Sequence, residues 1–163
     1  MTNFRDPYAV RASSRQYAEE LALEYYNGRN IKIIRSGFDA LNERIDYKHW
    51  MNTPKLIRNI PDYVIFTDKG NYFIECKCAR EYVHLKKSEL ESYEYWNSHL
   101  TVIMFVYSIT IKYIYRVLYQ RLIKMITDSN YELGIYEDNQ EEYYKVPVKD
   151  LFLIGESKRY EYK

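Results

Sequence analysis

The spacing of apolar residues divides the first part of the chain into a helix and a strand. Ser13 with Gln16 has the pattern of a capping box, which predicts a helix that begins near Ser13. Asn27-Gly28 is typical of a helix end. The apolar stripe of this helix consists of Tyr17, Ala18, Leu21, Ala22 and Tyr25. A short β-branched run then predicts a strand over residues 31–35.

Residues 60–78 have the pattern of a β-hairpin. Valine, isoleucine, tyrosine and phenylalanine dominate both arms, and residues 68–71 carry turn chemistry. A long connection over residues 36–59, with a short helical piece around residues 39–44, precedes this hairpin. Irregular segments of that length are often functional.

Strand geometry predicts which polar side chains of the hairpin lie together. If residues 69–70 form a two-residue loop, Asp62 lies opposite Lys77 and Val64 lies opposite Glu75. Directly opposed residues share a face, so Asp62, Glu75 and Lys77 would converge. A three-residue loop would break this parity unless a bulge restored it.

The rest of the chain alternates between helical and extended patterns. A polar segment leads into a helix, and an almost wholly apolar run then predicts a buried strand. The predicted elements are a helix over 86–98, a strand over 101–107, a helix over 111–127, strands over 133–136 and 143–146, and a short final element over 148–154.

The converging polar residues of the hairpin suit metal-dependent chemistry. Close carboxylates repel, and a hard divalent cation such as Mg²⁺ removes that repulsion. Asp62 and Glu75 would hold the ion, and the backbone carbonyl of Cys76 would add a ligand. Lys77 would place positive charge near a water nucleophile or a phosphoryl oxygen. The alternative is that Glu75 and Lys77 form an ordinary solvated ion pair.

These residues resemble the signature of the PD-(D/E)XK nuclease superfamily. Pro61-Asp62 matches its first element, and Glu75-Cys76-Lys77 matches its second. The predicted order of helices and strands resembles the αβββαβ core of that superfamily over residues 13–107, with a helical and hairpin extension over 108–163. The resemblance implies an α/β (α+β) fold with a restriction-endonuclease-like mixed central sheet flanked by helices, in a single domain over residues 1–163.

The resemblance also implies a further acidic residue on the first helix, facing the metal. Glu19, Glu20 and Glu24 are the candidates, and we favour Glu20. Mg²⁺ is the expected cofactor, with Mn²⁺ as a substitute. A solvated helix face is the alternative for each glutamate.

Within the superfamily the small size and single core look most like the small Holliday-junction resolvases, and Ser36-Gly37 and the helix that follows Lys77 fit that group loosely. This implies a DNA endonuclease acting on branched or structured DNA, and a homodimer with two sites. A restriction, repair or virus-type nuclease of the same fold is one alternative. A non-catalytic DNA-binding or scaffold protein is another, as is an enzyme of a different class. No Gly-rich phosphate loop or nucleophile elbow supports the last, and no nucleotide cofactor is expected.

Charge adds a candidate DNA-binding surface. The net charge is only +1, but residues 77–124 carry eight Lys/Arg against four Asp/Glu. We expect Lys86, Lys87, Arg116 and Arg121 to contact phosphates. An ordinary mixed surface explains the same counts equally well. The twenty tyrosines suit both core packing and stacking on unpaired bases.

Size and cysteine content complete the expectations. A chain of 163 residues with 47% hydrophobic residues is long enough for one domain with a core. Its start has no apolar h-region and no long apolar run follows, so we expect an intracellular protein (host cytoplasm, if virus-encoded) without membrane segments. Cys76 and Cys78 lie two residues apart on a strand, a poor geometry for a disulfide, and are expected to face the core.

Overall fold

The computed structural model describes residues 7–38 and 43–160, with side chains from residue 14 onward. The helices are α1 (Pro7–Asn27), α2 (Tyr47–Asn52), α3 (Lys55–Arg58), α4 (Lys87–His99), α5 (Tyr119–Asp128) and the 3-10 helix η1 (Val148–Leu153). The strands are β1 (Lys32–Arg35), β2 (Tyr63–Thr67), β3 (Gly70–Ala79), β4 (Tyr82–Lys86), β5 (Val102–Ser108), β6 (Tyr113–Leu118), β7 (Leu133–Ile135), β8 (Glu142–Pro147) and β9 (Glu156–Arg159).

The strands form two sheets. Within the described residues, the large sheet has six strands in the order β1-β2-β3-β5-β6-β9, and the small sheet has three in the order β4-β8-β7. β3 and β5 are parallel, whereas the other neighbours in the large sheet are antiparallel. A parallel pair requires a crossover connection, which β4 and α4 supply here. The predicted fold class, a mixed central sheet flanked by helices, is confirmed.

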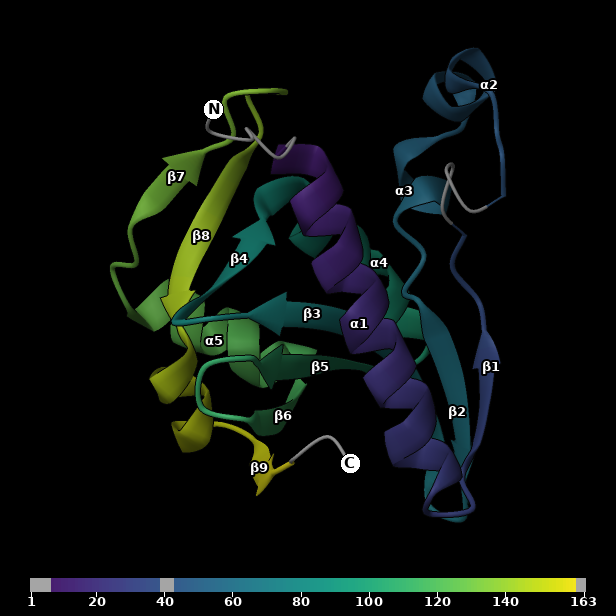
Figure 1. The fold of residues 1–163 in the computed structure, drawn as a ribbon, viewed down its shortest axis with the longest axis vertical. Helices are drawn as coiled ribbons and strands as arrows, with labels where there is room; N and C mark the ends of the chain where they lie inside the picture. The colour runs from purple at the N-terminus through teal and green to yellow at the C-terminus, as the bar shows by residue number, and fades with distance from the viewer. Residues whose placement is uncertain (1–6, 39–42, 161–163) are drawn as a thin grey trace, which may run out of the picture.

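Helices cover both faces of the large sheet (Figure 1). On one face α1 packs against β3 and β5, where Ile74 and Phe105 are buried beneath it. On the other face, α4 and α5 pack over Met104 and Val117. β5 is buried at every position because both of its faces are covered.

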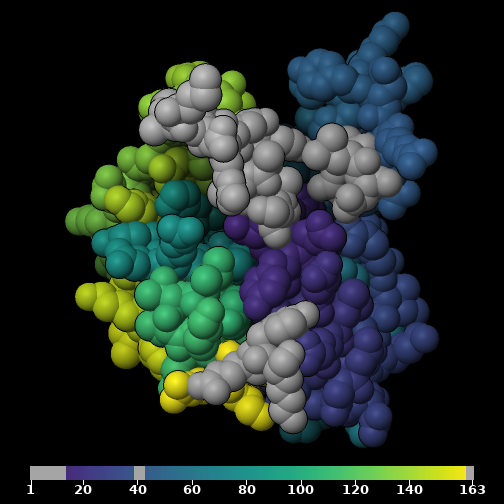
Figure 2. Space-filling model, viewed as in Figure 1, coloured from purple at the N-terminus to yellow at the C-terminus, as the bar shows by residue number. Residues whose placement is uncertain are grey.

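Helix α1 begins earlier than the capping pattern predicts. It starts at Pro7, a residue that suits the first helical turn, so Ser13 and Gln16 lie inside the helix and the predicted start is wrong. The predicted end is confirmed, because Gly28 N–H donates to Glu24 O at 3.0 Å. The outer surface of α1 is visible in purple in Figure 2. No helix in the described part of the chain is long and apolar enough to cross a membrane.

The β2–β3 hairpin forms as predicted, but with a different loop. The loop is residues 68–69, so Thr67 pairs with Gly70 and Val64 pairs with Phe73. The predicted pairing of Val64 with Glu75 is therefore wrong by two residues. The Thr67 hydroxyl closes the turn by donating to Gly70 O at 2.8 Å. A shift of two residues preserves parity, but Asp62 lies one residue before β2 and outside the paired register, so its sharing of a face with Glu75 and Lys77 stays a prediction.

Two strands replace segments that the sequence analysis left polar or helical. β4 occupies the polar segment before α4, and its Val83 and Leu85 alternate into the core. β6 occupies the first part of the helix predicted over 111–127, and only α5 is helical there. The residues of β6 form a strand rather than a helix because both faces of the strand are covered. Ile114 packs on the α1 side, and Val117 packs on the opposite side.

The remaining segments agree better with the elements predicted from the sequence. The predicted tail strands form β7 and β8, which pair antiparallel, and η1 is the predicted final element. β9 was not predicted, because all its positions are exposed and it has no alternating pattern. The connection after β1 contains α2 and α3. The helical piece predicted around residues 39–44 lies partly outside the described residues, and residues 43–44 form a turn.

The double cover of β5 generates a stability prediction. Phe105→Ala removes a fully buried ring that packs against Tyr25 and Tyr26, and should lower the free energy of unfolding by about 3–5 kcal/mol. Phe66→Ala removes a ring that is 42% exposed, and should cost about 1 kcal/mol or less. Urea unfolding of both variants measures the difference, and equal losses would contradict the two-sided burial of β5.

Candidate active site

Asp62 lies directly before β2, where neighbouring backbone groups fix it. Its side chain is only 1% exposed, and Oδ2 accepts a hydrogen bond from Cys76 N–H at 2.8 Å. Its carbonyl accepts from the N–H groups of Ser36 and Gly37 at 3.0 and 3.1 Å. A Cβ on Gly37 would approach the Asp62 Cα at 3.1 Å, so glycine permits this close approach.

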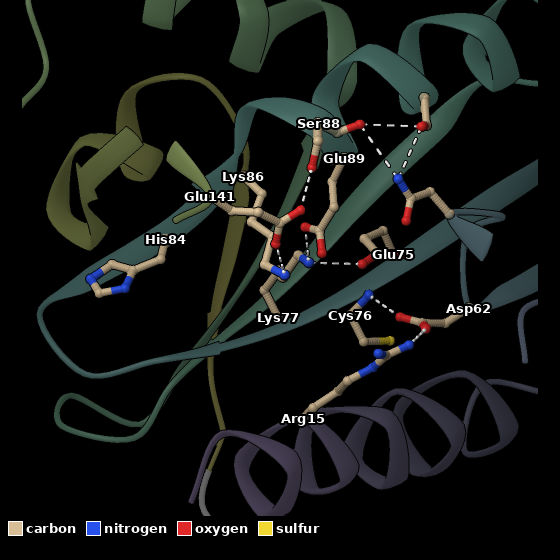
Figure 3. Close-up of polar contacts among 12 residues, drawn as sticks. Arg15, Asp62, Glu75, Cys76, Lys77, His84, Lys86, Ser88, Glu89 and Glu141 are labelled. Atoms are coloured by element: carbon tan, nitrogen blue, oxygen red, sulfur yellow. Dashed lines mark hydrogen bonds and ion pairs between the residues drawn. The ribbon is translucent and has the colours of Figure 1, made fainter. Parts of the chain in front are cut away.

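A guanidinium group from α1 balances the buried charge of Asp62 (Figure 3). Arg15 Nη2 contacts Asp62 Oδ1 at 3.0 Å, and Arg15 Nε contacts Glu19 Oε1 at 3.1 Å. Arg35 from β1 holds the other oxygen of Glu19 at 2.7 Å. Although burial opposes its charge, the carboxylates of Asp62, Glu75 and Glu19 raise the pKa of Arg15. A chain of alternating charges therefore joins α1, β1 and β2.

The acidic residue of α1 that faces this site is Glu19. Glu19 is buried, whereas Glu20 and Glu24 are exposed. Glu20 accepts a hydrogen bond from Gln16 Nε2 at 3.2 Å. The prediction that Glu20 faces the site is therefore wrong, and Glu19, another of the three candidates, faces it. The row Arg15, Glu19, Ala22 and Tyr26 follows helical spacing, and the full burial of its last two members turns it toward the sheet.

Lys77 lies between two carboxylates (Figure 3). Its Nζ is 3.0 Å from Glu75 Oε1 and 2.7 Å from Glu89 Oε2 on the first turn of α4. Burial opposes the ammonium charge, but Glu89 and Glu75 outweigh it and raise the pKa of Lys77. Burial likewise opposes the charge of Glu89, but Lys77 and Lys86 together lower its pKa. Glu89 is a site residue that the sequence analysis missed.

Glu75 carries the most perturbed carboxyl of the site. It is buried, and its charge is one of the causes that raise the pKa of Tyr93, after burial of that hydroxyl. Burial first, and the nearby charge of Asp62 second, raise the pKa of Glu75 to about 7. Lys77 opposes this shift without cancelling it. Uncompensated negative charge at a buried position is typical of functional sites.

The predicted DNA-contacting cations do not form one cluster. Lys86 pairs with Glu141 at 2.6 Å and Lys87 pairs with Glu142 at 2.8 Å, both next to the start of α4. Arg116 contacts Glu156 at 2.8 Å and the Tyr26 hydroxyl at 3.2 Å, on the α1 side of the sheet. Arg121 lies on α5, and its Nη1 donates to the Ile154 carbonyl at 3.4 Å. The first two lysines are thus near the site, and the two arginines belong to other surfaces.

The donor chemistry of the site suits a hard divalent cation. The carboxylates of Asp62 and Glu75 offer oxygen atoms of the kind that such a cation takes, and the carbonyl of Cys76 points to the same neighbouring strand as its N–H, toward Asp62. Among the described residues, however, no three His, Cys, Asp or Glu side chains are grouped to hold a metal. Arg15 occupies the cationic position beside Asp62. The cysteine thiols add no ligand: Cys76 is buried, and burial raises the pKa of both Cys76 and Cys78.

The fold is similar to that of Hjc, a Holliday junction resolvase from Archaeoglobus fulgidus. The TM-score is 0.51 at 13% sequence identity, over 87% of this chain and 89% of that chain. D212, a nuclease from a fusselovirus, gives a TM-score of 0.49 at 9% identity, over 91% of this chain and 88% of that chain. No protein-family model matches the chain, and no curated protein matches it. The likeness to the resolvase confirms the fold implied by the sequence resemblance.

The raised pKa of Glu75 predicts how stability depends on pH. In EDTA, the free energy of unfolding should fall as the pH rises from about 4.5 to about 7. In that window native Glu75 holds a proton that the unfolded chain has lost, so rising pH favours unfolding. This carboxyl contributes no more than about 3 kcal/mol.

Urea unfolding in pH steps measures this dependence. Glu75→Gln should flatten it, because the variant has no carboxyl to titrate. Glu142→Gln, at a carboxylate that is 49% exposed and pairs with Lys87, should leave it unchanged. A Glu75→Gln variant with the wild-type slope would contradict the assignment.

Proposed function

We propose that this protein is a Mg²⁺-dependent DNA endonuclease that hydrolyses phosphodiester bonds in branched or structured DNA. One observation carries the proposal: Asp62, Glu75 and Lys77 converge from one hairpin, with both carboxylates buried. The likeness in fold to a Holliday junction resolvase supports DNA as the substrate. A homodimer would provide two such sites for two strands of a junction.

Asp62, Glu75 and the Cys76 carbonyl would hold the cation, and Mn²⁺ would substitute for Mg²⁺. When bound, a divalent cation polarises the phosphate and lowers the pKa of a coordinated water. Arg15 balances Asp62 when no cation is present, since its guanidinium contacts Oδ1. A cation that binds Asp62 would therefore compete with Arg15 for the negative charge of that carboxylate.

Lys77 would act on the reacting phosphate. Glu75 and Glu89 hold its ammonium group at 3.0 and 2.7 Å, so the charge is positioned before DNA arrives. Positive charge there stabilises the negative charge that develops during attack by water. Glu89 would act as a positioning residue, because it contacts Lys77 and keeps it protonated.

A specific observation favours one other function, a DNA-binding protein without turnover. Both oxygens of Asp62 are already engaged, by Arg15 and by the Cys76 N–H. Because Arg15 balances the charge of Asp62, the site can stay folded without a metal ion. The two functions differ in whether Mg²⁺ binds and whether DNA is cut.

The test combines DNA cleavage with calorimetry of Mg²⁺ binding. Four-way-junction, nicked, linear and single-stranded DNA are incubated with the protein in Mg²⁺ or in EDTA. We expect the junction to be cut only in Mg²⁺, and Asp62→Asn and Glu75→Gln to lose both cleavage and Mg²⁺ affinity. Arg15→Gln should bind Mg²⁺ more tightly, because Asp62 Oδ1 is then free of its competing cation.

Two outcomes would contradict the proposal in different ways. Wild-type protein that binds Mg²⁺ but cuts no DNA under any condition would favour the non-catalytic alternative. Unchanged Mg²⁺ affinity in both Asp62→Asn and Glu75→Gln would place any metal elsewhere.

A separate prediction isolates the role of Lys77. Lys77→Ala should bind junction DNA nearly as well as wild type in Ca²⁺, because the ammonium acts mainly in the transition state. Its single-turnover cleavage rate should fall about 10²–10³-fold. Lys124→Ala, at an exposed lysine of α5 that pairs with Asp128, is the matched control. A near-wild-type rate for Lys77→Ala would reduce Lys77 to an ion-pair partner of Glu75 and Glu89.

A further inference from the structure

The outer face of the small sheet carries aromatic and basic side chains. Val83 and Leu85 of β4 point into the core, so the alternate residues of that strand point outward. His84 is exposed and Tyr82 is 42% exposed. Tyr143 and Lys145 lie on the same side of β8, because they pair with Lys86 and His84 across the strands.

Three rings on this face pack against one another. The rings of His84 and Tyr143 stack with centroids 4.3 Å apart at an interplanar angle of 23°. Tyr136 lies just after β7, and its ring centroid is 4.3 Å from that of Tyr143. Its hydroxyl is 3.4 Å from His84 Nδ1. These contacts hold flat rings in place on an exposed sheet.

A glycine makes room for the central ring. Gly134 pairs with Tyr143, and a Cβ at Gly134 would meet the Tyr143 ring at 2.3 Å. The absence of a side chain at Gly134 therefore allows Tyr143 to lie across β7. The arrangement of rings depends on the backbone of the small sheet.

Lysines accompany these rings. Lys86 Nζ lies 5.6 Å from the Tyr136 ring centroid, and Lys145 Nζ lies 4.7 Å from that of Tyr82. Their carboxylate partners are Glu141 at 2.6 Å and Glu132 at 3.5 Å. Lys86 and Lys145 are each about one third exposed, so a phosphate group can replace a carboxylate without entering the core. Beyond Tyr82 the face continues into a hollow that Arg80 and Lys149 also line.

This face is continuous with the candidate active site. β4 ends at Lys86, directly before α4, which carries Glu89. Glu141 joins the two regions, because it pairs with Lys86 and accepts from the Ser88 hydroxyl at 3.0 Å. Figure 3 shows the side chain of Lys86 close to Lys77, with His84 farther along the same strand. Two residues along a strand span roughly 7 Å, so the rings lie within a few nucleotides of the site.

We propose that the outer face of the small sheet binds unpaired nucleotides of the DNA strand that enters the active site. Bases would stack on the rings of Tyr136, His84 and Tyr82, and phosphates would contact Lys86 and Lys145. The occupant is single-stranded DNA because its bases expose their π-faces, whereas the bases of a duplex are stacked internally. The alternation of rings and cations matches the alternation of bases and phosphates. This inference rests on the proposed function for its substrate.

The test measures affinity for a fluorescein-labelled oligothymidylate and for a blunt duplex, in EDTA. Tyr136→Leu and His84→Ala should each weaken oligothymidylate binding about tenfold, the usual effect of losing one stacked base. Duplex binding should stay unchanged. Tyr136→Phe keeps the ring and should keep wild-type affinity. Tyr95→Leu removes a ring that is 47% exposed on α4, where it contacts Trp96 and His99, and should have no effect.

The design separates this inference from the proposed function. Binding in EDTA needs no turnover, so failure of the cleavage assay leaves the stacking result interpretable. Unchanged oligothymidylate affinity in Tyr136→Leu and His84→Ala would overturn the inference, even if the protein cuts DNA. Equal loss of single-stranded and duplex binding would also overturn it, because stacking on unpaired bases predicts a selective loss. Thermal melting by circular dichroism checks that each variant is folded.

Discussion

The buried charge of Asp62 is the constraint on which the structure around the site depends. A carboxylate in the interior is stable only when its charge and its lone pairs are compensated. Arg15 of α1 supplies the charge and the Cys76 N–H of β3 supplies a hydrogen bond. The same contacts join α1, β3 and the residue before β2, so packing of the N-terminal helix is coupled to the geometry of the site. Losing Arg15 would leave a buried charge without its cation.

This coupling explains why the site contains more charged side chains than the three proposed for catalysis, Asp62, Glu75 and Lys77. Glu19, Asp62, Glu75 and Glu89 form a carboxylate-rich layer between α1 and α4. Their cationic neighbours are Arg15, Arg35 and Lys77. Each cation contacts carboxylates from another element, which holds the layer in register. At Glu75, burial first and the negative charge of Asp62 second raise the pKa of the carboxyl.

Local patterns in the sequence predict the hairpin and its three polar residues, because strand parity is a property of neighbouring residues. Parity survives even though the loop is misplaced by one residue. Arg15, Arg35 and Glu89 are not predictable in this way, because each meets the hairpin through tertiary packing. Glu20 was favoured over Glu19 because Tyr26, which is fully buried, was left out of the apolar stripe. At β6, burial on both faces overrides residues that recur at helical spacing.

The ends of the large sheet bear on how copies of this chain could associate. β1 and β9 are its outer strands within the described residues, and such strands can recruit a strand from another molecule. Both are short and rich in charge: β1 carries Lys32 and Arg35, and β9 carries Glu156, Lys158 and Arg159. Charged side chains on an outer strand oppose continuous pairing between sheets. Self-association of this protein would therefore use side-chain surfaces rather than extension of the sheet, which keeps the backbone of the central sheet out of any assembly.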